Sequence, residues 1–287
     1  MPIQRPTWLP SYIPELQGLR GVAVLGVFFY HCHPRLEGTW VHYASLWGWA
    51  GVNLFFVLSG FLITSILLEA REKPHYFRNF YGRRALRIWP VYALVLVFVY
   101  LNAPWFIGPS ITDAVKTAPW WAYILFVQNL FHLTLPPAVG PTWSLAIGLY
   151  TLTWSRRVWL GLGLLGMVAG FLAAGTVAGG TSFLDSALAV AFAGALLAAI
   201  ASTGARNPLN AVLRSGPLAY YGRISYGFYM THISVFIFFG WFDLRMDHYG
   251  MAGNLAVVAF RLAACTGVAT ALWYGFESPI LKLKRHF

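Results

Sequence analysis

Long apolar runs alternate with short polar segments over most of the chain. About 20 apolar residues are enough for a helix to cross the hydrocarbon core of a bilayer, whereas a strand of a membrane barrel needs only about 10. The runs have the helical length, so the pattern predicts a bundle of membrane-spanning helices. We expect about eight spans, at residues 19–36, 46–69, 88–103, 118–135, 158–178, 183–201, 217–240 and 252–276.

Composition agrees with this pattern. Apolar residues make up 58% of the chain and charged residues only 10%, with a mean hydropathy of +0.61, whereas about a quarter of the residues of soluble proteins are charged. We therefore expect an all-α integral membrane protein that forms a single domain over residues 1–287. No metal site is expected, because neither Cys32 nor Cys265 has a histidine or a second cysteine at ligand spacing.

The distribution of charge predicts the orientation of the chain. The formal net charge is +11, and with both termini cytoplasmic nearly all lysines and arginines fall on the cytoplasmic side. Only Arg35, Lys116 and Arg245 then fall on the other side. This asymmetry follows the positive-inside rule and the attraction of anionic membrane lipid, so the charge requires no nucleic acid as a partner. The N-terminal segment is rich in proline and lacks an apolar core, so we expect no cleaved signal peptide.

The first apolar segment contains an arginine and a histidine, Arg20 and His31. They are eleven residues apart, which at about 100° per residue places them within about 20° of each other around a helix and about 16 Å apart along it. A charge so near hydrocarbon costs several kcal/mol unless it is paired or faces a polar cavity, so the pair predicts a functional face. The plainer interpretation is an arginine that reaches the cytoplasmic interface and a histidine that only packs.

A second polar segment, expected to be a loop over residues 76–90, carries three arginines at the start of the third span. Arg83 and Arg87 share one helical face, and Arg84 lies beside Arg83. A guanidinium matches phosphate oxygens, and a helix N-terminus adds partial positive charge, so the cluster predicts phosphate binding. Lipid head groups are the alternative partners of these arginines.

The seventh expected span carries a stripe of polar groups. Ser225, Tyr229 and His232 follow one another at i, i+4 and i+7, and Tyr226 lies beside them. We expect the stripe to line the path of a polar substrate, while packing and helix-end hydrogen bonding are the plain alternatives. Arg261, near the middle of the last span, is expected to face the bundle because its charge is costly in lipid.

Five motifs together resemble those of the membrane-bound acyltransferase-3 family and follow the family's order. They are Leu16–Arg20 with His31, Phe55–Ile63, Arg83–Pro90, Thr142–Leu145 and Ser225–His232. The resemblance implies transfer of an acyl group, commonly acetyl, from cytoplasmic acyl-CoA to a hydroxyl of a carbohydrate, an envelope glycan or a secondary metabolite. Acyl-CoA is then a co-substrate rather than a bound cofactor. The resemblance also implies a multi-pass protein of a bacterial plasma membrane.

Site roles follow from the resemblance together with side-chain chemistry. His31 is expected to act as the general base on the acceptor hydroxyl, or to accept the acyl group and relay it across the membrane, and the sequence leaves both roles open. Arg20 is the second catalytic candidate, either guiding the donor phosphates or stabilising charge on the thioester oxygen. The acyl-CoA-binding candidates are Arg83, Arg84 and Arg87. The acceptor-path candidates are Asn53, Trp143, Ser144, Ser225, Tyr226, Tyr229 and His232.

The chain also departs from the family pattern. Paired glutamates usually follow the motif at Thr142–Leu145, whereas Ala146–Thr151 holds no carboxylate. The family usually has ten spans, and the polar stretch Thr151–Arg157 stands where another helix is expected, so the chain looks internally shortened. Gln17 and Asn53 stand where acidic residues are common. The lost carboxylate favours the alternative function, a catalytically degenerate relative that serves as a lipid or glycan transporter or as a membrane binding subunit. The costly charges that are retained, Arg20, His31, Arg83, Arg84 and Arg87, favour an active O-acyltransferase, which is the function we expect.

Overall fold

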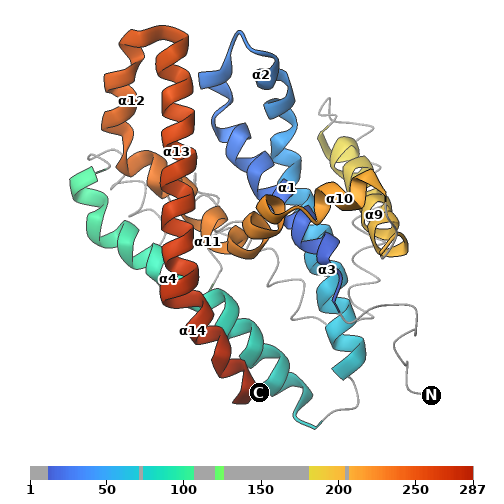
Figure 1. The fold of residues 1–287 in the computed structure, drawn as a ribbon. Coiled ribbons are helices and arrows are strands. Elements are labelled where there is room, and N and C mark those ends of the chain that lie inside the picture. The colour runs from blue at the N-terminus through green and yellow to red at the C-terminus, as the bar shows by residue number, and fades with distance from the viewer. Residues whose placement is uncertain (1–11, 71–73, 107–119, 126–180, 204–206, 287) are drawn as a thin grey trace.

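The computed structural model describes residues 12–70, 74–106, 120–125, 181–203 and 207–286 (Figure 1). Every regular element in these ranges is helical, so the all-α prediction is confirmed for this part of the chain. The longer helices are α1 (Pro14–His31), α3 (Ala50–Ala70), α4 (Tyr76–Phe106), α9 (Thr181–Ala201), α11 (Gly216–Phe238) and α13 (Gly250–Leu272). The shorter α-helices are α2 (Trp40–Ser45), α6 (Trp120–Ile124), α10 (Pro208–Leu213), α12 (Gly240–Met246) and α14 (Ser278–Leu281). The remaining turns are η1 (His33–Leu36), η2 (Leu46–Trp49), η5 (Asp247–Tyr249), the π-helical η6 (Trp273–Glu277) and η7 (Lys282–His286).

Most of the expected spans coincide with helices. The six that do so are 19–36, 46–69, 88–103, 183–201, 217–240 and 252–276, which correspond to α1, α3, α4, α9, α11 and α13. The span expected at 118–135 meets the described residues mainly at α6, and the span at 158–178 lies outside them. Two helical runs contain an 18-residue stretch apolar enough to cross a membrane, Trp40–Leu67 and Gly240–Arg285. The eight-span topology and the cytoplasmic position of both termini stay predictions.

The loop expected over residues 76–90 is wrong, because α4 begins at Tyr76 and continues through this whole segment. Alanine, leucine and arginine are all strong helix formers, and they dominate the stretch from Arg83 to Arg87. Pro90 removes one backbone donor without ending the helix. The arginines therefore lie about two to three turns inside α4, and the expected contribution of a helix N-terminus at Arg83 is wrong too.

The end of α1 has a local cause in the sequence. Pro34 has no N–H to donate to the carbonyl of Tyr30, which an uninterrupted helix requires at this position. The ring of His33 takes over this role, with its Nδ1 donating to the Tyr30 carbonyl oxygen at 2.6 Å. The α-helix consequently ends at His31, and the chain continues into η1.

Helix α1 packs between α3 on one side and α11 on the other (Figure 1). Glycines allow the backbones of α1 and α11 to approach closely: a Cβ at Gly222 overlaps with the carbonyl oxygen of Gln17, and a Cβ at Gly21 overlaps with that of Leu218. Small residues of this kind are what bring helices together in a bilayer. Further along α1, Arg20 contacts Ser225 and His31 contacts His232, so α1 and α11 run in the same direction.

An aromatic core holds α11 against α1 and α13. Phe28 of α1 is fully buried and makes edge-on contacts with Phe228 at 5.8 Å and Phe236 at 5.6 Å between ring centroids. Cys32 and Cys265 are also buried in this cluster and are unpaired thiols. Packing of large rings over the close helix contact fixes the position of α11 relative to α1.

The charge of Arg261 faces the bundle, as expected from the sequence. Its guanidinium pairs with the buried carboxylate of Asp243 in α12 and lies 4.2 Å from the ring centroid of Phe236. Arg35 of η1 pairs with Asp247 and lies 3.9 Å from Asp243. These ion pairs join η1, α12 and α13 at the upper end of Figure 1, and they explain Arg261 through packing rather than substrate binding.

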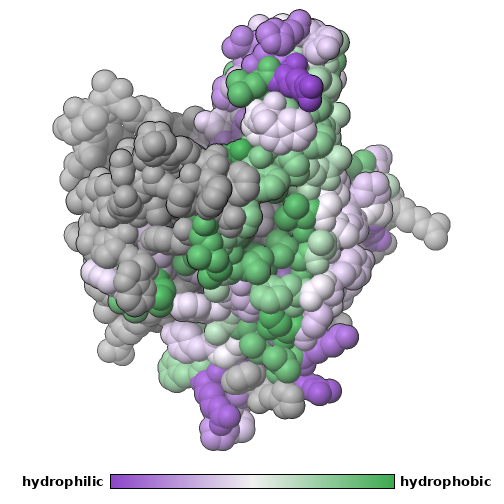
Figure 2. Space-filling view, turned by 90° about the vertical axis from the view of Figure 1, so that its left-hand side faces the viewer, coloured by the Kyte–Doolittle hydropathy of each residue, from purple (hydrophilic) through white to green (hydrophobic). Residues whose placement is uncertain are grey.

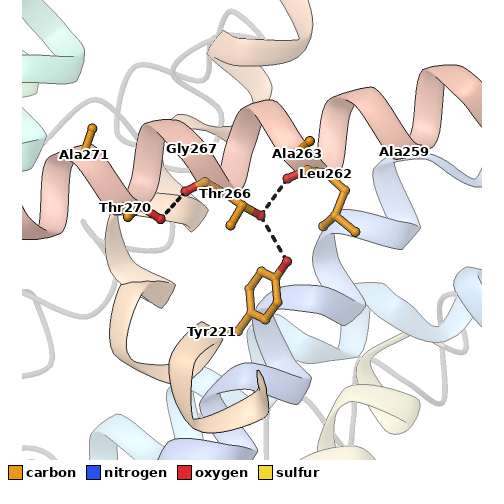
Figure 3. A pocket seen from close by; sticks show the side chains of 8 residues that line it. All are labelled: Tyr221, Ala259, Leu262, Ala263, Thr266, Gly267, Thr270 and Ala271. Atoms are coloured by element: carbon orange, nitrogen blue, oxygen red, sulfur yellow. Dashed lines mark hydrogen bonds between the residues drawn. The ribbon is translucent and has the colours of Figure 1, made fainter. Parts of the chain in front are cut away.

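The described surface separates apolar from polar groups. Figure 2 shows hydrophobic residues along the middle of one face, with hydrophilic residues gathered at the top and the bottom. On α13 a shallow hollow lies between small side chains, and its polar groups are satisfied locally (Figure 3). The hydroxyl of Thr266 donates to the Leu262 carbonyl at 2.7 Å and lies 3.0 Å from the Tyr221 hydroxyl. Such internal pairing suits a surface in contact with lipid.

Replacing Gly222 by alanine is expected to destabilise the protein by roughly 1–3 kcal/mol, because the added methyl group forces α1 and α11 apart. Gly267→Ala is the matched control: among the described atoms a Cβ at Gly267 meets nothing within 4 Å, so stability should stay equal or rise by about 1 kcal/mol. Thermal unfolding of both variants in the same detergent measures the difference. Equal unfolding temperatures for the two variants would contradict the close contact.

Candidate functional site

Arg20 is anchored to α11 by a single buried serine. Its Nη2 donates to the hydroxyl oxygen of Ser225 at 2.8 Å, and that hydroxyl donates in turn to the carbonyl of Gly222 at 2.9 Å. Ser225 has no exposed surface. The two hydrogen bonds fix the guanidinium against the helix that lies closest to α1, and so hold its charge inside the bundle.

Helix α4 adds two more arginines beside Arg20. Arg87 interacts electrostatically with Arg20, and Arg84 interacts with Arg87. Tyr226 of α11 lies in the same group, and its hydroxyl donates to the Ile88 carbonyl of α4 at 2.7 Å. Tyr226 therefore ties α11 to α4 at the level of the arginines.

An acidic residue, Glu277, also belongs to this group and was not among the site residues expected from the sequence. Its carboxylate is 6% exposed and interacts with both Arg20 and Arg87. Within the described part of the chain its Oε1 has no hydrogen-bond partner, and it lies 2.6 Å from the position of a Cβ on Gly227. A signal was present in the sequence, because Glu277 is the only acidic residue after Asp247 and directly follows the last apolar run.

We call Arg20, Arg84, Arg87 and Glu277 the basic cluster. Three guanidinium groups and one carboxylate leave the cluster with an excess of positive charge; Arg20 and Arg84 are half-buried and Arg87 is exposed. Like charges this close repel one another, and an anion bound among them relieves the repulsion. Guanidinium groups bind phosphate and carboxylate oxygens with two parallel N–H donors, so the cluster is suited to an anion with several phosphate oxygens.

The basic cluster continues into the C-terminal segment, which packs on α4. Lys284 lies beyond the last expected span, 252–276, and is half-buried. Burial, together with the nearby guanidinium groups of Arg87 and Arg83, lowers the pKa of Lys284 to about 8. Arg83 itself is exposed and lies on the outer side of this group. Lys284 was not among the acyl-CoA-binding residues expected from the sequence.

Two histidines meet at the other end of α1. The ring centroids of His31 and His232 are 5.1 Å apart, and the planes are tilted by 48°. His31 is exposed at the last position of α1, whereas His232 is only 1% exposed. Tyr229 lies between His232 and α3, with centroid distances of 5.8 Å to His232 and 5.9 Å to Phe55.

The prediction that Arg20 and His31 share one face of a helix is confirmed. Both face α11, where Arg20 meets Ser225 and His31 meets His232. Eleven residues of α-helix separate the two positions, which corresponds to about 16 Å along α1. One face of α1 thus joins a positively charged end to an end with two imidazoles.

The remaining candidates differ in how far the structure places them. Ser225, Tyr226, Tyr229 and His232 all face α1, α3 or α4, as described above. Asn53 lies half-buried near the start of α3. Trp143 and Ser144 lie outside the described residues. Within the described ranges, no three histidine, cysteine, aspartate or glutamate side chains gather as a metal site.

Comparison with known proteins connects this arrangement to one family. Residues 13–151 match the family model described as the acyltransferase domain, acyltransferase-3 type. Over 147 residues the chain is 33% identical to the peptidoglycan O-acetyltransferase OatA of Listeria monocytogenes; the aligned region covers 48% of this chain and 22% of that relative. It is 34% identical over 149 residues to the putative peptidoglycan O-acetyltransferase YrhL of Bacillus subtilis, covering 47% and 22%. It is also 34% identical over 148 residues to the O-acetyltransferase OatA of Staphylococcus aureus, covering 48% and 23%.

The extent of these matches is limited. The chain spans about a fifth of the length of the curated relatives it matches. The family match includes Arg20, His31, Arg83, Arg84 and Arg87, and it ends before α11 and Glu277. No solved structure matches the chain.

Glu277→Gln is expected to destabilise the protein by about 1–3 kcal/mol, because it leaves the guanidinium groups of Arg20 and Arg87 without their negative partner. Added pyrophosphate should restore most of this loss by taking the place of the carboxylate. Glu37→Gln, which changes an exposed glutamate, serves as the control and should leave stability unchanged. Thermal unfolding with and without pyrophosphate measures the effect, and a stable Glu277→Gln variant that ignores pyrophosphate would contradict it.

Proposed function

We propose, from the match of residues 13–151 to the acyltransferase-3 family model, that this chain is a membrane O-acyltransferase. In this proposal it moves an acyl group, most simply acetyl, from cytoplasmic acyl-CoA to a hydroxyl of an envelope glycan. The relatives are bacterial and are named for O-acetyl transfer, two of them to peptidoglycan. The membrane is then a bacterial plasma membrane, with the basic cluster at its cytoplasmic side.

One observation supports this function most strongly: a single face of α1 carries Arg20 in the basic cluster and, about 16 Å further along, the exposed His31. Acyl-CoA has the matching shape, because its nucleotide end is polyanionic and its thioester lies at the tip of a long flexible arm. A donor with its phosphates on the basic cluster can extend along α1 and bring the thioester to His31. The same chain then binds the donor and performs the transfer.

The donor end consists of groups that hold phosphate. Arg84 and Arg87 come from α4 and Arg20 from α1, so the phosphates connect elements that are otherwise joined through Tyr226 and Glu277. Arg20 belongs to this end rather than to the reacting end, because the length of α1 between Arg20 and His31 is too great for contact with a carbonyl at His31. We therefore assign Arg20 to donor binding and not to stabilisation of the oxyanion.

The reaction centre is His31, and two balanced routes are available to it. As a general base, His31 takes the proton of the acceptor hydroxyl while the oxygen attacks the thioester carbon. The C–O bond forms, the C–S bond breaks, and the proton passes from His31 to the departing thiolate. As a nucleophile, the His31 nitrogen attacks the same carbon, the C–S bond breaks and CoA leaves as the thiolate; the acceptor oxygen then takes the acyl group from the imidazole, and the hydroxyl proton passes to the CoA thiolate.

The acceptor end lies at the end of α1 that leads into η1 and α2. Exposed aromatic side chains are frequent there, including Trp40 and Trp47. Aromatic faces suit both the membrane interface and the apolar faces of sugars. We propose a glycan hydroxyl as the acceptor on the basis of the relatives' names, with the acceptor reaching His31 from this end.

Transfer of radiolabelled acetate from acetyl-CoA by membranes that contain the chain tests the function. His31→Ala and the double variant Arg84→Ala/Arg87→Ala are expected to lose at least about 99% of the activity, since the first lacks the reacting group and the second lacks the phosphate ligands. His248→Ala and Arg78→Ala change an exposed histidine and an exposed arginine of α4, and both should stay active. Equal activity of all four variants would contradict the proposal, and so would a correctly inserted wild type that transfers no acetate. Either result would favour the alternative function, a catalytically degenerate relative.

Affinity for CoA is expected to fall as pH rises through about 8, because Lys284 then loses the charge that attracts phosphate. The ammonium form predominates below this pH, so binding is strongest there, and the loss between pH 7 and pH 9 should be roughly threefold. Lys284→Arg keeps its charge throughout and should abolish most of this dependence. Lys282→Arg, at an exposed position, should behave as wild type. Equilibrium binding of labelled CoA decides, and an unchanged pH dependence in Lys284→Arg would refute the assignment.

A further inference from the structure

The hydrogen bonds of His232 define its tautomer. Nδ1 lies 2.7 Å from the carbonyl oxygen of Tyr229. A carbonyl oxygen only accepts hydrogen bonds, so Nδ1 must carry the proton. In a neutral imidazole the other nitrogen, Nε2, is then a bare acceptor.

That acceptor has no partner within the described part of the chain. His232 is 1% exposed, and its Nε2 is buried without a hydrogen bond. An unpaired buried acceptor costs about 1–3 kcal/mol. Buried polar groups normally form hydrogen bonds, so an acceptor without one, here Nε2 of His232 next to the proposed reaction centre, indicates a role in function.

The neighbouring imidazole is that of His31, at 5.1 Å between ring centroids. At this separation two five-membered rings leave room for an N–H···N hydrogen bond of about 3 Å between their edges. The other close rings are those of Tyr229 and Phe236, which carry no nitrogen. His31 is exposed and its ring lies edge-on to Tyr30, whereas His232 is held in place by Tyr229 and Phe236.

We propose that His232 is a positioning residue for His31: its Nε2 accepts a hydrogen bond from one ring N–H of His31 and so directs the lone pair of the other His31 nitrogen toward the reactants. This inference rests on the proposed function. His232 stays neutral and gains or loses no proton in the reaction. It fixes the tautomer of His31 in the same way for both routes.

The arrangement acts at the step where His31 becomes positively charged. When the outer nitrogen of His31 takes the acceptor proton, or the acyl group, the inner N–H becomes a stronger donor. The bond to His232 then strengthens, and it weakens again when the proton passes to the CoA thiolate or the acyl group passes to the acceptor oxygen. The bond is thus strongest in the charged state, which is the condition for lowering the barrier.

The test combines kinetics with the ¹⁵N resonances of the imidazoles. His232→Leu removes the acceptor, whereas His232→Gln places an amide oxygen close to the position of Nε2. We expect His232→Leu to lower kcat for acetyl transfer about a hundredfold with KM for acetyl-CoA nearly unchanged, and His232→Gln to recover at least about a tenth of the wild-type value. His42→Leu is the control, because His42 also bonds a backbone carbonyl at the same end of the molecule but lies outside the pair.

Solid-state ¹⁵N spectra of the histidine-labelled protein in bilayers provide the readout that a purely structural role does not change. In the wild type His31 should show a single tautomer with a hydrogen-bonded N–H, and in His232→Leu a mixture of both tautomers. An unchanged His31 spectrum together with unchanged kcat in His232→Leu would overturn the inference. The spectra do not depend on turnover. A wild type that transfers no acetyl group would therefore contradict the proposed function alone, and the His31 tautomer in wild type and His232→Leu would still test whether His232 positions His31.

Discussion

The close approach of two helix backbones is the constraint on which the rest of the structure depends. Gly222 of α11 lies directly against the Gln17 carbonyl of α1, and no side chain fits between them. Because the helices meet this closely and run in the same direction, Arg20 reaches Ser225 and His31 reaches His232. A wider separation would break both contacts at once. The glycines therefore determine the site as much as the residues that form it.

Electrostatics then separates the costly charges into two kinds. Arg261 is matched by the Asp243 carboxylate and an aromatic ring, which makes it part of the packing. The basic cluster is not matched, since it holds three guanidinium groups and one carboxylate, that of Glu277, which interacts with Arg20 and Arg87. The unbalanced cluster is the one whose charge attracts a polyanionic ligand, and its Arg20 lies on the face of α1 that also carries His31.

The sequence predicted local features well and distant contacts poorly. The shared face of Arg20 and His31 follows from helical spacing over eleven residues, so no tertiary information was needed. Glu277 was missed because it comes near Arg20 only through tertiary packing, in which η6 lies against α4. The helix over residues 76–90 was misread because Gly82 and Pro90 are typical of turns, while the strong helix formers between them decide the conformation. The meeting of His31 with His232 depends on the α1–α11 contact, which no periodicity reveals.

The most direct test of the account is the structure of the chain in a lipid nanodisc with a non-hydrolysable thioether analogue of acetyl-CoA. The account predicts the phosphates among the arginines of the basic cluster, with the arm along α1 and the acetyl end in contact with the ring of His31. An analogue bound at another surface, or one whose acetyl end points away from His31 while its phosphates occupy the basic cluster, would contradict the claim that one face of α1 carries both donor binding and transfer.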